Sequence, residues 1–254
     1  MQSPSMMLVS GAGAILIAVI LLSASSSVGE ASDVRYRMFR PTAPGSHPAV
    51  VFVSGCDGFT PARAPTSYER RAEHFRAQGY IVIFADYLGR RGLKSCAVSI
   101  THKDAAQDLV AAAAWLGSQA GVDRGRITAI GWSYGGRAVL DALLEHAQGQ
   151  LAFSRAVVYY PDCRDLEPWK TTLPVLMLLA GDDDMTPAKL CQEVAKRTAA
   201  PTAVKIIVYA GAQHAFDVSE LPAKMRLGFG TIGYHAEAAA AARDEVQRFL
   251  RPAR

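Results

Sequence analysis

A single hexapeptide near the middle of the chain, Gly-Trp-Ser-Tyr-Gly-Gly at residues 131–136, most limits the folds that this sequence can adopt. It follows a strand-like run at residues 126–130 and precedes a helix-like pattern at residues 137–144. A Gly-x-Ser-x-Gly motif at a strand-to-helix junction is typical of a nucleophile elbow, a tight turn that holds the serine hydroxyl above the sheet edge. Such a turn leaves no room for Cβ atoms at Gly131 and Gly135. The new helix would point its positive end at Ser133, where an oxyanion would form.

Strand-like and helix-like segments alternate along the chain on both sides of this motif. Apolar runs predict buried strands, and apolar residues at helical spacing predict helices. The expected strands are residues 35–40, 49–53, 80–85, 126–130, 155–160, 174–179 and 204–209, and the expected helices are residues 66–78, 103–117, 137–144, 187–198 and 234–250. This order predicts an α/β fold with a mostly parallel central sheet and helices on both faces.

The connection between the strands ending at residue 160 and starting at residue 174 is too short for a lid domain. We therefore expect an open site without a large lid. The longest irregular stretch, residues 216–233, is the one expected to flank it.

The length of 254 residues is sufficient for one large domain and its core. The first 34 residues contain no lysine or arginine, and residues 6–22 are almost wholly apolar before a serine-rich segment. This pattern resembles a secretory signal peptide, although it lacks a basic start. We predict that residues 1–31 are a signal peptide or an N-terminal membrane anchor and that residues 32–254 form the folded domain. The protein is expected to be exported, either periplasmic or secreted, and to contact a membrane only through its N-terminal segment.

The chain has four cysteines, widely spaced and without a Cys-x-x-Cys pair that would suggest zinc binding or redox chemistry. Together with the predicted leader they indicate two disulfide bonds, although spacing cannot choose among three possible pairings. A net charge of +4, with scattered basic residues, gives no indication of nucleic-acid binding. No metal ion and no organic cofactor is expected.

A serine hydroxyl at neutral pH needs a base to accept its proton. Among the six histidines, His214 is the one that directly follows a late predicted strand, at the edge where Ser133 also emerges. A carboxylate must hold the imidazole, and in the expected order Ser, Asp, His it lies between the two. Asp182, Asp183 and Asp184 all meet this requirement, and spacing does not choose among them.

An oxyanion hole needs two backbone N–H groups. One is the amide of Tyr134, directly after the nucleophile. The other is expected from the turn after the first buried strand, where the amide of Cys56 or of Asp57 is the candidate.

These motifs together resemble the dienelactone hydrolase family of α/β-hydrolases, across nearly all of the chain after the leader. The matching segments are residues 50–58, 85–92, 131–136, 181–187 and 209–217. The resemblance implies the α/β-hydrolase fold, and it implies Asp183 as the triad acid because the family's aspartate stands four residues before a proline, here Pro187. Asp184 is the second choice. Arg90 and Trp132 are the predicted substrate-binding residues.

The sequence departs from the family at two positions. Dienelactone hydrolases proper have a cysteine where this chain has Ser133, and they hold a substrate carboxylate with two arginines. Arg90 matches one arginine, but Val218 stands where the other would fall. The chain is more similar to exported, disulfide-bearing members, and that likeness implies the pairs Cys56–Cys96 and Cys163–Cys191.

The sequence thus predicts a serine hydrolase that cleaves small-molecule carboxylic esters or lactones through an acyl-enzyme. A peptidase or acyltransferase is the near alternative, because Ser-Tyr-Gly-Gly also resembles the elbow of prolyl oligopeptidases. A non-catalytic exported binding protein on the same fold is the alternative from another class. The oligomeric state is not predicted.

Overall fold

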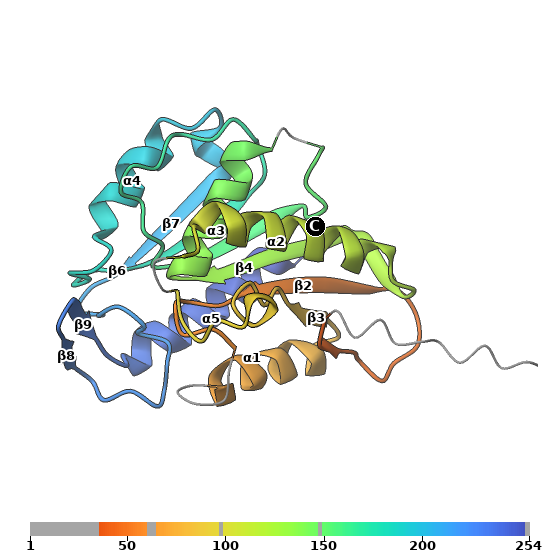
Figure 1. Ribbon diagram of the computed structural model, residues 1–254, viewed down its shortest axis with the longest axis horizontal. Coiled ribbons are helices and arrows are strands. Elements are labelled where there is room, and N and C mark those ends of the chain that lie inside the picture. The colour runs from red at the N-terminus through yellow and green to blue at the C-terminus, as the bar shows by residue number, and fades with distance from the viewer. Residues whose placement is uncertain (1–35, 60–64, 97–98, 147–148, 252–254) are drawn as a thin grey trace, which may run out of the picture. The chain divides into compact units, whose positions relative to one another are not determined.

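The computed structural model describes residues 36–59, 65–96, 99–146 and 149–251. They form a seven-stranded sheet in the order β1-β3-β2-β4-β5-β6-β7, parallel except at β1, and a separate two-stranded hairpin (Figure 1). The strands are β1 (Met38–Phe39), β2 (His47–Val53), β3 (Ile81–Phe84), β4 (Val122–Trp132), β5 (Arg155–Tyr159), β6 (Val175–Ala180), β7 (Val204–Tyr209), β8 (Met225–Leu227) and β9 (Gly230–Ile232). The predicted α/β-hydrolase architecture is confirmed. The predicted leader at residues 1–31 lies outside the described residues.

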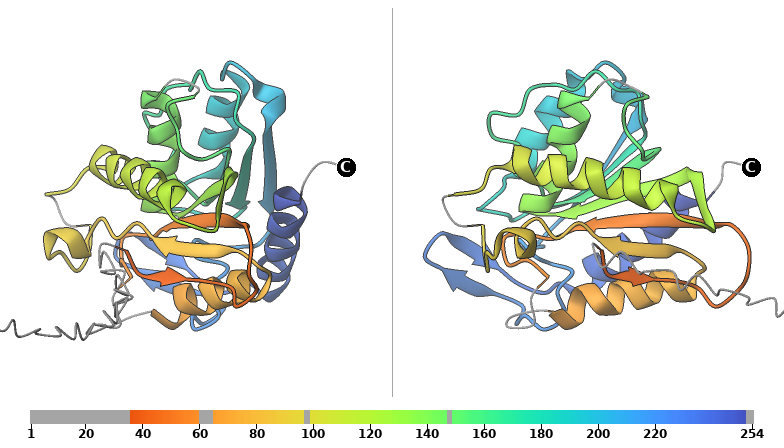
Figure 2. Two further views of the ribbon diagram at one scale, coloured as in Figure 1. Left: turned by 90° about the vertical axis from the view of Figure 1, so that its right-hand side faces the viewer. Right: turned by 45° about the vertical axis from the view of Figure 1, so that its right-hand side comes forward.

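Helices cover both faces of the sheet, as Figures 1 and 2 show. One face packs against α2, α3 and α4, and the other packs against α1 and α5. The α-helices are α1 (Pro65–Ala77), α2 (His102–Ser118), α3 (Tyr134–Glu145), α4 (Ala188–Lys196) and α5 (Ala236–Leu250), with short 3₁₀ turns at Gly89–Arg91 and Pro201–Ala203. Every residue of β3 and β6 is buried, because helices cover both of their faces.

The order in which strands are added to the sheet reverses at β2. From β2 the chain crosses through α1 to β3 on one side, whereas β4 pairs with β2 on the other side. Val53 at the end of β2 lies beside Gly131 near the end of β4. The loops that leave these two strands therefore diverge to opposite faces. Ligands of open α/β sheets bind at such a switch point, outside the carboxyl ends of the strands.

The stretch predicted to be irregular, residues 216–233, instead contains the hairpin of β8 and β9. The prediction missed it because each strand has three residues and leaves no alternating apolar pattern to recognise. The first predicted strand is likewise shorter than expected, with only Met38–Phe39 paired to β3.

The disulfide bonds join Cys56 to Cys96 and Cys163 to Cys191, the pairs that the resemblance implies. The first ties the loop after β2 to the segment before α2. The second ties the segment after β5 to the buried face of α4. In the part of the chain that the structure describes, no helix has the length and apolar character needed to cross a bilayer.

Candidate active site

The elbow has the tight geometry that its glycines predict. Ser133 adopts φ 50° and ψ −114°, a conformation that L-residues rarely adopt, and its N–H donates to the carbonyl of Tyr159 at 2.9 Å. A Cβ on Gly131 would lie 2.3 Å from the carbonyl oxygen of Gly135. A Cβ on Gly135 would lie 2.3 Å from the carbonyl oxygen of Ser54. Only glycine fits at either position, and α3 therefore starts directly against the end of β2.

Ser133, His214 and Asp183 form a continuous hydrogen-bonded chain. The Nε2 atom of His214 lies 2.9 Å from Oγ of Ser133, and its Nδ1 atom lies 2.8 Å from Oδ2 of Asp183. His214 is 4% exposed and Asp183 is 6% exposed, whereas Ser133 is half-buried. Water thus has little access to the inner pair, while the hydroxyl stays within reach of a ligand.

The carboxylate of Asp183 is held by further donors from the turn before α4. Its Oδ1 atom accepts the backbone N–H groups of Met185 and Thr186, at 2.9 and 2.8 Å. The hydroxyl of Thr186 lies 2.8 Å from Oδ2 of Asp183 and 3.1 Å from the carbonyl oxygen of Tyr160. Thr186 was not among the predicted site residues. An Asp-x-x-Thr turn before a helix is the sequence signal that could have found it.

The two neighbouring aspartates face elsewhere. Asp184 accepts the backbone N–H and the hydroxyl of Thr231 at 2.7 and 2.9 Å and pairs with Arg226 at 2.7 Å. The Thr231 hydrogen bonds lower the pKa of Asp184. Asp182 is exposed. The aspartate against His214 is therefore Asp183, and Asp184 anchors the β8–β9 hairpin, whose Ile232 forms a β-bridge with His214.

Two tyrosine hydroxyls hold the backbone of Gly55, in the loop after β2. The N–H of Gly55 donates to Oη of Tyr68 at 2.9 Å, and the carbonyl of Gly55 accepts from the hydroxyl of Tyr87 at 2.8 Å. Burial raises the pKa of both tyrosines, so both hydroxyls keep their protons. A Cβ on Gly55 would lie 3.7 Å from Cβ of Ser133, so this loop adjoins the nucleophile. Sequence reasoning missed both tyrosines, because they lie on separate elements.

Cys56, the next residue, is fixed on its other side. Its carbonyl accepts the N–H of Cys96 at 2.9 Å, and its side chain forms the disulfide with Cys96. Tyr87 therefore holds the peptide group between Gly55 and Cys56, and Cys96 holds the peptide group that follows it. The two candidates for the second oxyanion donor, the amides of Cys56 and Asp57, belong to these two peptide groups.

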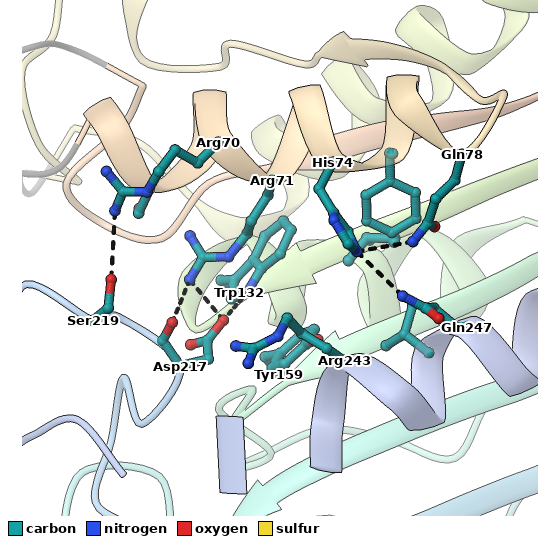
Figure 3. Close-up of a pocket in the computed structure, with 14 residues that line it drawn as sticks. Arg70, Arg71, His74, Gln78, Trp132, Tyr159, Asp217, Ser219, Arg243 and Gln247 are labelled. Carbon is teal, nitrogen blue, oxygen red and sulfur yellow. Dashed lines mark hydrogen bonds and ion pairs between the residues drawn. The ribbon is translucent and has the colours of Figure 1, made fainter. Parts of the chain in front are cut away.

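A buried hydrogen-bonded network around Asp217 contacts the ring of His214 through Tyr160. The ring of Tyr160 lies 4.6 Å from the ring of His214, and its hydroxyl donates to Oδ1 of Asp217 at 2.6 Å. The Oδ2 atom of Asp217 accepts from Arg71 at 2.8 Å and from the indole N–H of Trp132 at 2.9 Å (Figure 3). Positive φ values at Ser133, Tyr160 and Ala215 place strained backbone beside all parts of this arrangement.

The side chains of the two predicted substrate-binding residues make their described contacts away from the triad. Trp132 is 3% exposed and packs on the face covered by α1 and α5. Arg90 lies 3.3 Å from the hydroxyl of Tyr36 and 3.4 Å from Asp108. Their roles toward a substrate remain predictions.

Replacing Asp217 with alanine is expected to lower the free energy of unfolding by about 3–5 kcal/mol, because the Arg71 guanidinium would lose its buried partner. The side chains of Arg71 and Asp217 are only 17% and 5% exposed. Urea unfolding of the oxidised protein measures the change. Glu73→Ala, which breaks an exposed pair with Arg76 on the same helix, should cost less than about 1 kcal/mol. Equal losses in the two variants would contradict the structural role of Asp217.

No cluster of three or more His, Cys, Asp or Glu side chains suited to a metal ion occurs within the described ranges.

A family model, the dienelactone hydrolase family, matches residues 34–253. No curated protein matches the chain.

The fold is similar to several solved structures. A protein described as a dienelactone hydrolase from Klebsiella pneumoniae is 20% identical, with a TM-score of 0.66 over 85% of this chain and 91% of that one. A dienelactone hydrolase-like promiscuous phosphotriesterase from metagenomic libraries is 18% identical, with a TM-score of 0.63 over 85% of this chain and 96% of that one. An esterase from Thermogutta terrifontis is 17% identical, with a TM-score of 0.59 over 85% of this chain and 86% of that one.

Proposed function

The chain belongs to the dienelactone hydrolase family, and we propose that it is a serine hydrolase that cleaves carboxylic esters or lactones through an acyl-enzyme. The observation that carries the proposal is the hydrogen-bonded chain from Ser133 through His214 to Asp183, with both contacts under 3 Å. A serine with a base within hydrogen-bond reach, and a carboxylate holding that base, is the arrangement that nucleophilic acyl transfer requires.

The proposed reaction proceeds in two halves. His214 takes the proton of Ser133 through Nε2 as Oγ attacks the acyl carbon, and it then gives that proton to the leaving alcohol. Water attacks the acyl-enzyme in the second half, again with His214 as base, and releases the acid and free Ser133. Asp183 keeps the proton of His214 on Nδ1 and stabilises the imidazolium.

The negative charge on the tetrahedral oxygen needs donors that are already in position. We assign this role to the amides of Tyr134 and Cys56. The Tyr134 amide is at the start of α3, where the helix leaves N–H groups unpaired. The carbonyl of Gly55 is fixed by Tyr87, and in a trans peptide the N–H of Cys56 points the opposite way. Tyr87 would therefore orient the second donor without touching the substrate.

Replacing Tyr87 with phenylalanine is expected to lower kcat about tenfold to a hundredfold with a smaller change in KM. The variant loses the hydroxyl that orients the Gly55–Cys56 peptide, and losing a whole oxyanion donor costs about 10²–10³ in kcat. Tyr209→Phe is the matched control, because the buried Tyr209 hydroxyl has no hydrogen-bond partner within the described part of the chain. Steady-state kinetics of wild type, Tyr87→Phe and Tyr209→Phe measure the effect. An unchanged kcat in Tyr87→Phe would contradict the role of Tyr87 in orienting the oxyanion donor.

The substrate class is inferred from what the chain has and lacks. Arg90 is present, but Val218 occupies the place of a second arginine, which favours neutral esters or lactones over a dienelactone carboxylate. Structural neighbours named as an esterase and a phosphotriesterase support ester chemistry. The two disulfides support an oxidising, exported location, because such bonds persist outside the cytosol. A signal peptide or an N-terminal membrane anchor at residues 1–31 remains part of the proposal.

The experiment that tests this function compares leaving groups on the oxidised wild-type protein. We expect p-nitrophenyl esters of short acids to be hydrolysed and the matching p-nitroanilides to remain intact. Cleavage of peptide anilides at comparable kcat/KM would favour the peptidase alternative. Failure to turn over any ester, by protein shown to be folded, would favour the non-catalytic binding protein.

A further inference from the structure

A cavity of about 260 Å³ lies between α1, α5 and the sheet, and neither Ser133 nor His214 lines it (Figure 3). Its apolar walls come from all three layers: Phe75 on α1, Ile130 and Trp132 on β4, Tyr159 on β5 and Val246 on α5. Its volume is several times the roughly 30 Å³ that one water occupies in the liquid. It lies just below the usual range for drug-sized ligands, about 300–1,000 Å³, so its occupant would be small.

Polar side chains line both ends of this cavity. At one end the side-chain amides of Gln78 and Gln247 lie 2.9 and 3.2 Å from Nε2 of His74. At the other end Arg71 pairs with Asp217. Figure 3 shows these two groups at opposite ends of the row of side chains between the helices. The cavity thus has polar side chains at both ends and an apolar, largely aromatic wall between them, and it is partly open to solvent.

The charges that line the cavity do not balance. Three arginines, Arg70, Arg71 and Arg243, stand against one carboxylate, that of Asp217. Arg71 is neutralised by Asp217, and Arg70 pairs with Glu220. Arg243 is exposed, and it makes no ion pair or hydrogen bond with any residue that the structure describes. Its charge is close enough to Tyr159 to act on the pKa of that residue, in the lowering direction.

The carboxylate of Asp217 already accepts from three other side chains, and no hydrogen bond or ion pair joins it to Arg243 within the described residues. Its Oδ1 atom accepts from Tyr160, and its Oδ2 atom accepts from both Arg71 and Trp132. An arginine guanidinium offers a fork of donors that matches a carboxylate in a bidentate pair. The cavity therefore presents one unpaired arginine, Arg243, next to its apolar, largely aromatic wall.

We propose that this cavity is a second, non-catalytic ligand site that binds a small carboxylate with an apolar body. The carboxylate pairs with Arg243, and the apolar body packs on Trp132 and Tyr159 between the two helices. This site is separate from the triad and does not depend on the proposed reaction. Binding of the ligand would bury the apolar wall of the cavity and would give Arg243 a charged partner.

The test titrates the full oxidised chain with 3-phenylpropanoate and follows tryptophan fluorescence, since Trp132 lines the cavity. Calorimetry provides a second measurement of the dissociation constant. We expect saturable binding, and we expect 3-phenylpropanol, which lacks the charge, to bind at least tenfold more weakly.

The variant Arg243→Gln locates the site. It is expected to weaken binding of 3-phenylpropanoate at least tenfold, whereas Arg248→Gln should leave it unchanged. Arg248 lies on the same helix and has the same charge, but it pairs with Glu245 and does not line the cavity. Trp132→Phe should retain binding by calorimetry and lose the fluorescence response.

Three results would overturn the proposal. These are equal affinity in Arg243→Gln and wild type, equal affinity for the acid and the alcohol, and no saturable binding at millimolar concentrations. Hydrolysis of esters by the same preparations is measured in parallel. Its loss or survival does not bear on the cavity, so the two proposals fail separately.

Discussion

Replacing Ser133 with alanine is expected to lower kcat for p-nitrophenyl ester hydrolysis by about 10⁴- to 10⁶-fold, with the fold and its stability unchanged. The variant keeps the oxyanion donors and the binding surface, so a residual rate above that of water should remain. We expect a large loss because no other hydroxyl is hydrogen-bonded to Nε2 of His214 in the described chain, so no other group is placed to replace Ser133 as the nucleophile.

Ser154→Ala is the matched control for this substitution. Ser154 is half-buried and makes one side-chain hydrogen bond, to the carbonyl of Ile127, before β5 begins. Its loss should leave kcat within experimental error of wild type. Comparable activity in Ser133→Ala and wild type would mean that another group performs the attack.

Replacing Asp183 with asparagine is expected to lower kcat by about 10⁴-fold while KM changes little. An asparagine of the same shape no longer fixes the proton of His214 on Nδ1, so the imidazole takes the wrong tautomer and cannot accept the serine proton. Asp183 also accepts two backbone N–H groups and the Thr186 hydroxyl. Those contacts should hold the side chain at position 183 in place, so the substitution should change the proton transfer at His214, and therefore kcat, more than substrate binding.

The neighbouring aspartates provide the controls. Asp182→Asn changes an exposed side chain and should retain wild-type kinetics. Asp184→Asn weakens the anchor of the β8–β9 hairpin and should change kcat by less than about tenfold, because Asp184 faces Thr231 and Arg226. A large loss in Asp184→Asn with activity retained in Asp183→Asn would reverse the assignment.

Much of the fold follows from local sequence pattern. Strands β2, β6 and β7 consist mainly of apolar residues, and their predicted bounds agree with the structure to within two residues. The elbow was equally predictable, because the glycines at 131 and 135 report a steric requirement that acts within one turn. The hairpin of β8 and β9 was not, because its position depends on Asp184, more than forty residues earlier in the chain.

The site shows the same division. Ser133 and His214 could be named because each follows a strand at the carboxyl edge of the sheet. Spacing could not choose among three adjacent aspartates, since the choice depends on how the turn before α4 directs each side chain. The sequence gave no signal for the roles of Tyr68, Tyr87 and Tyr160 at the site. Their hydroxyls meet Gly55 and Asp217 only after distant elements have packed together.

Labelling of the folded, oxidised protein with a fluorophosphonate, followed by peptide mass mapping, tests most directly whether Ser133 is an activated nucleophile. We expect one adduct per chain, on Ser133, and no adduct in Ser133→Ala. We also expect an ester substrate to slow the labelling. An unlabelled wild-type protein with an intact fold, or an adduct on another residue, would contradict this role of Ser133.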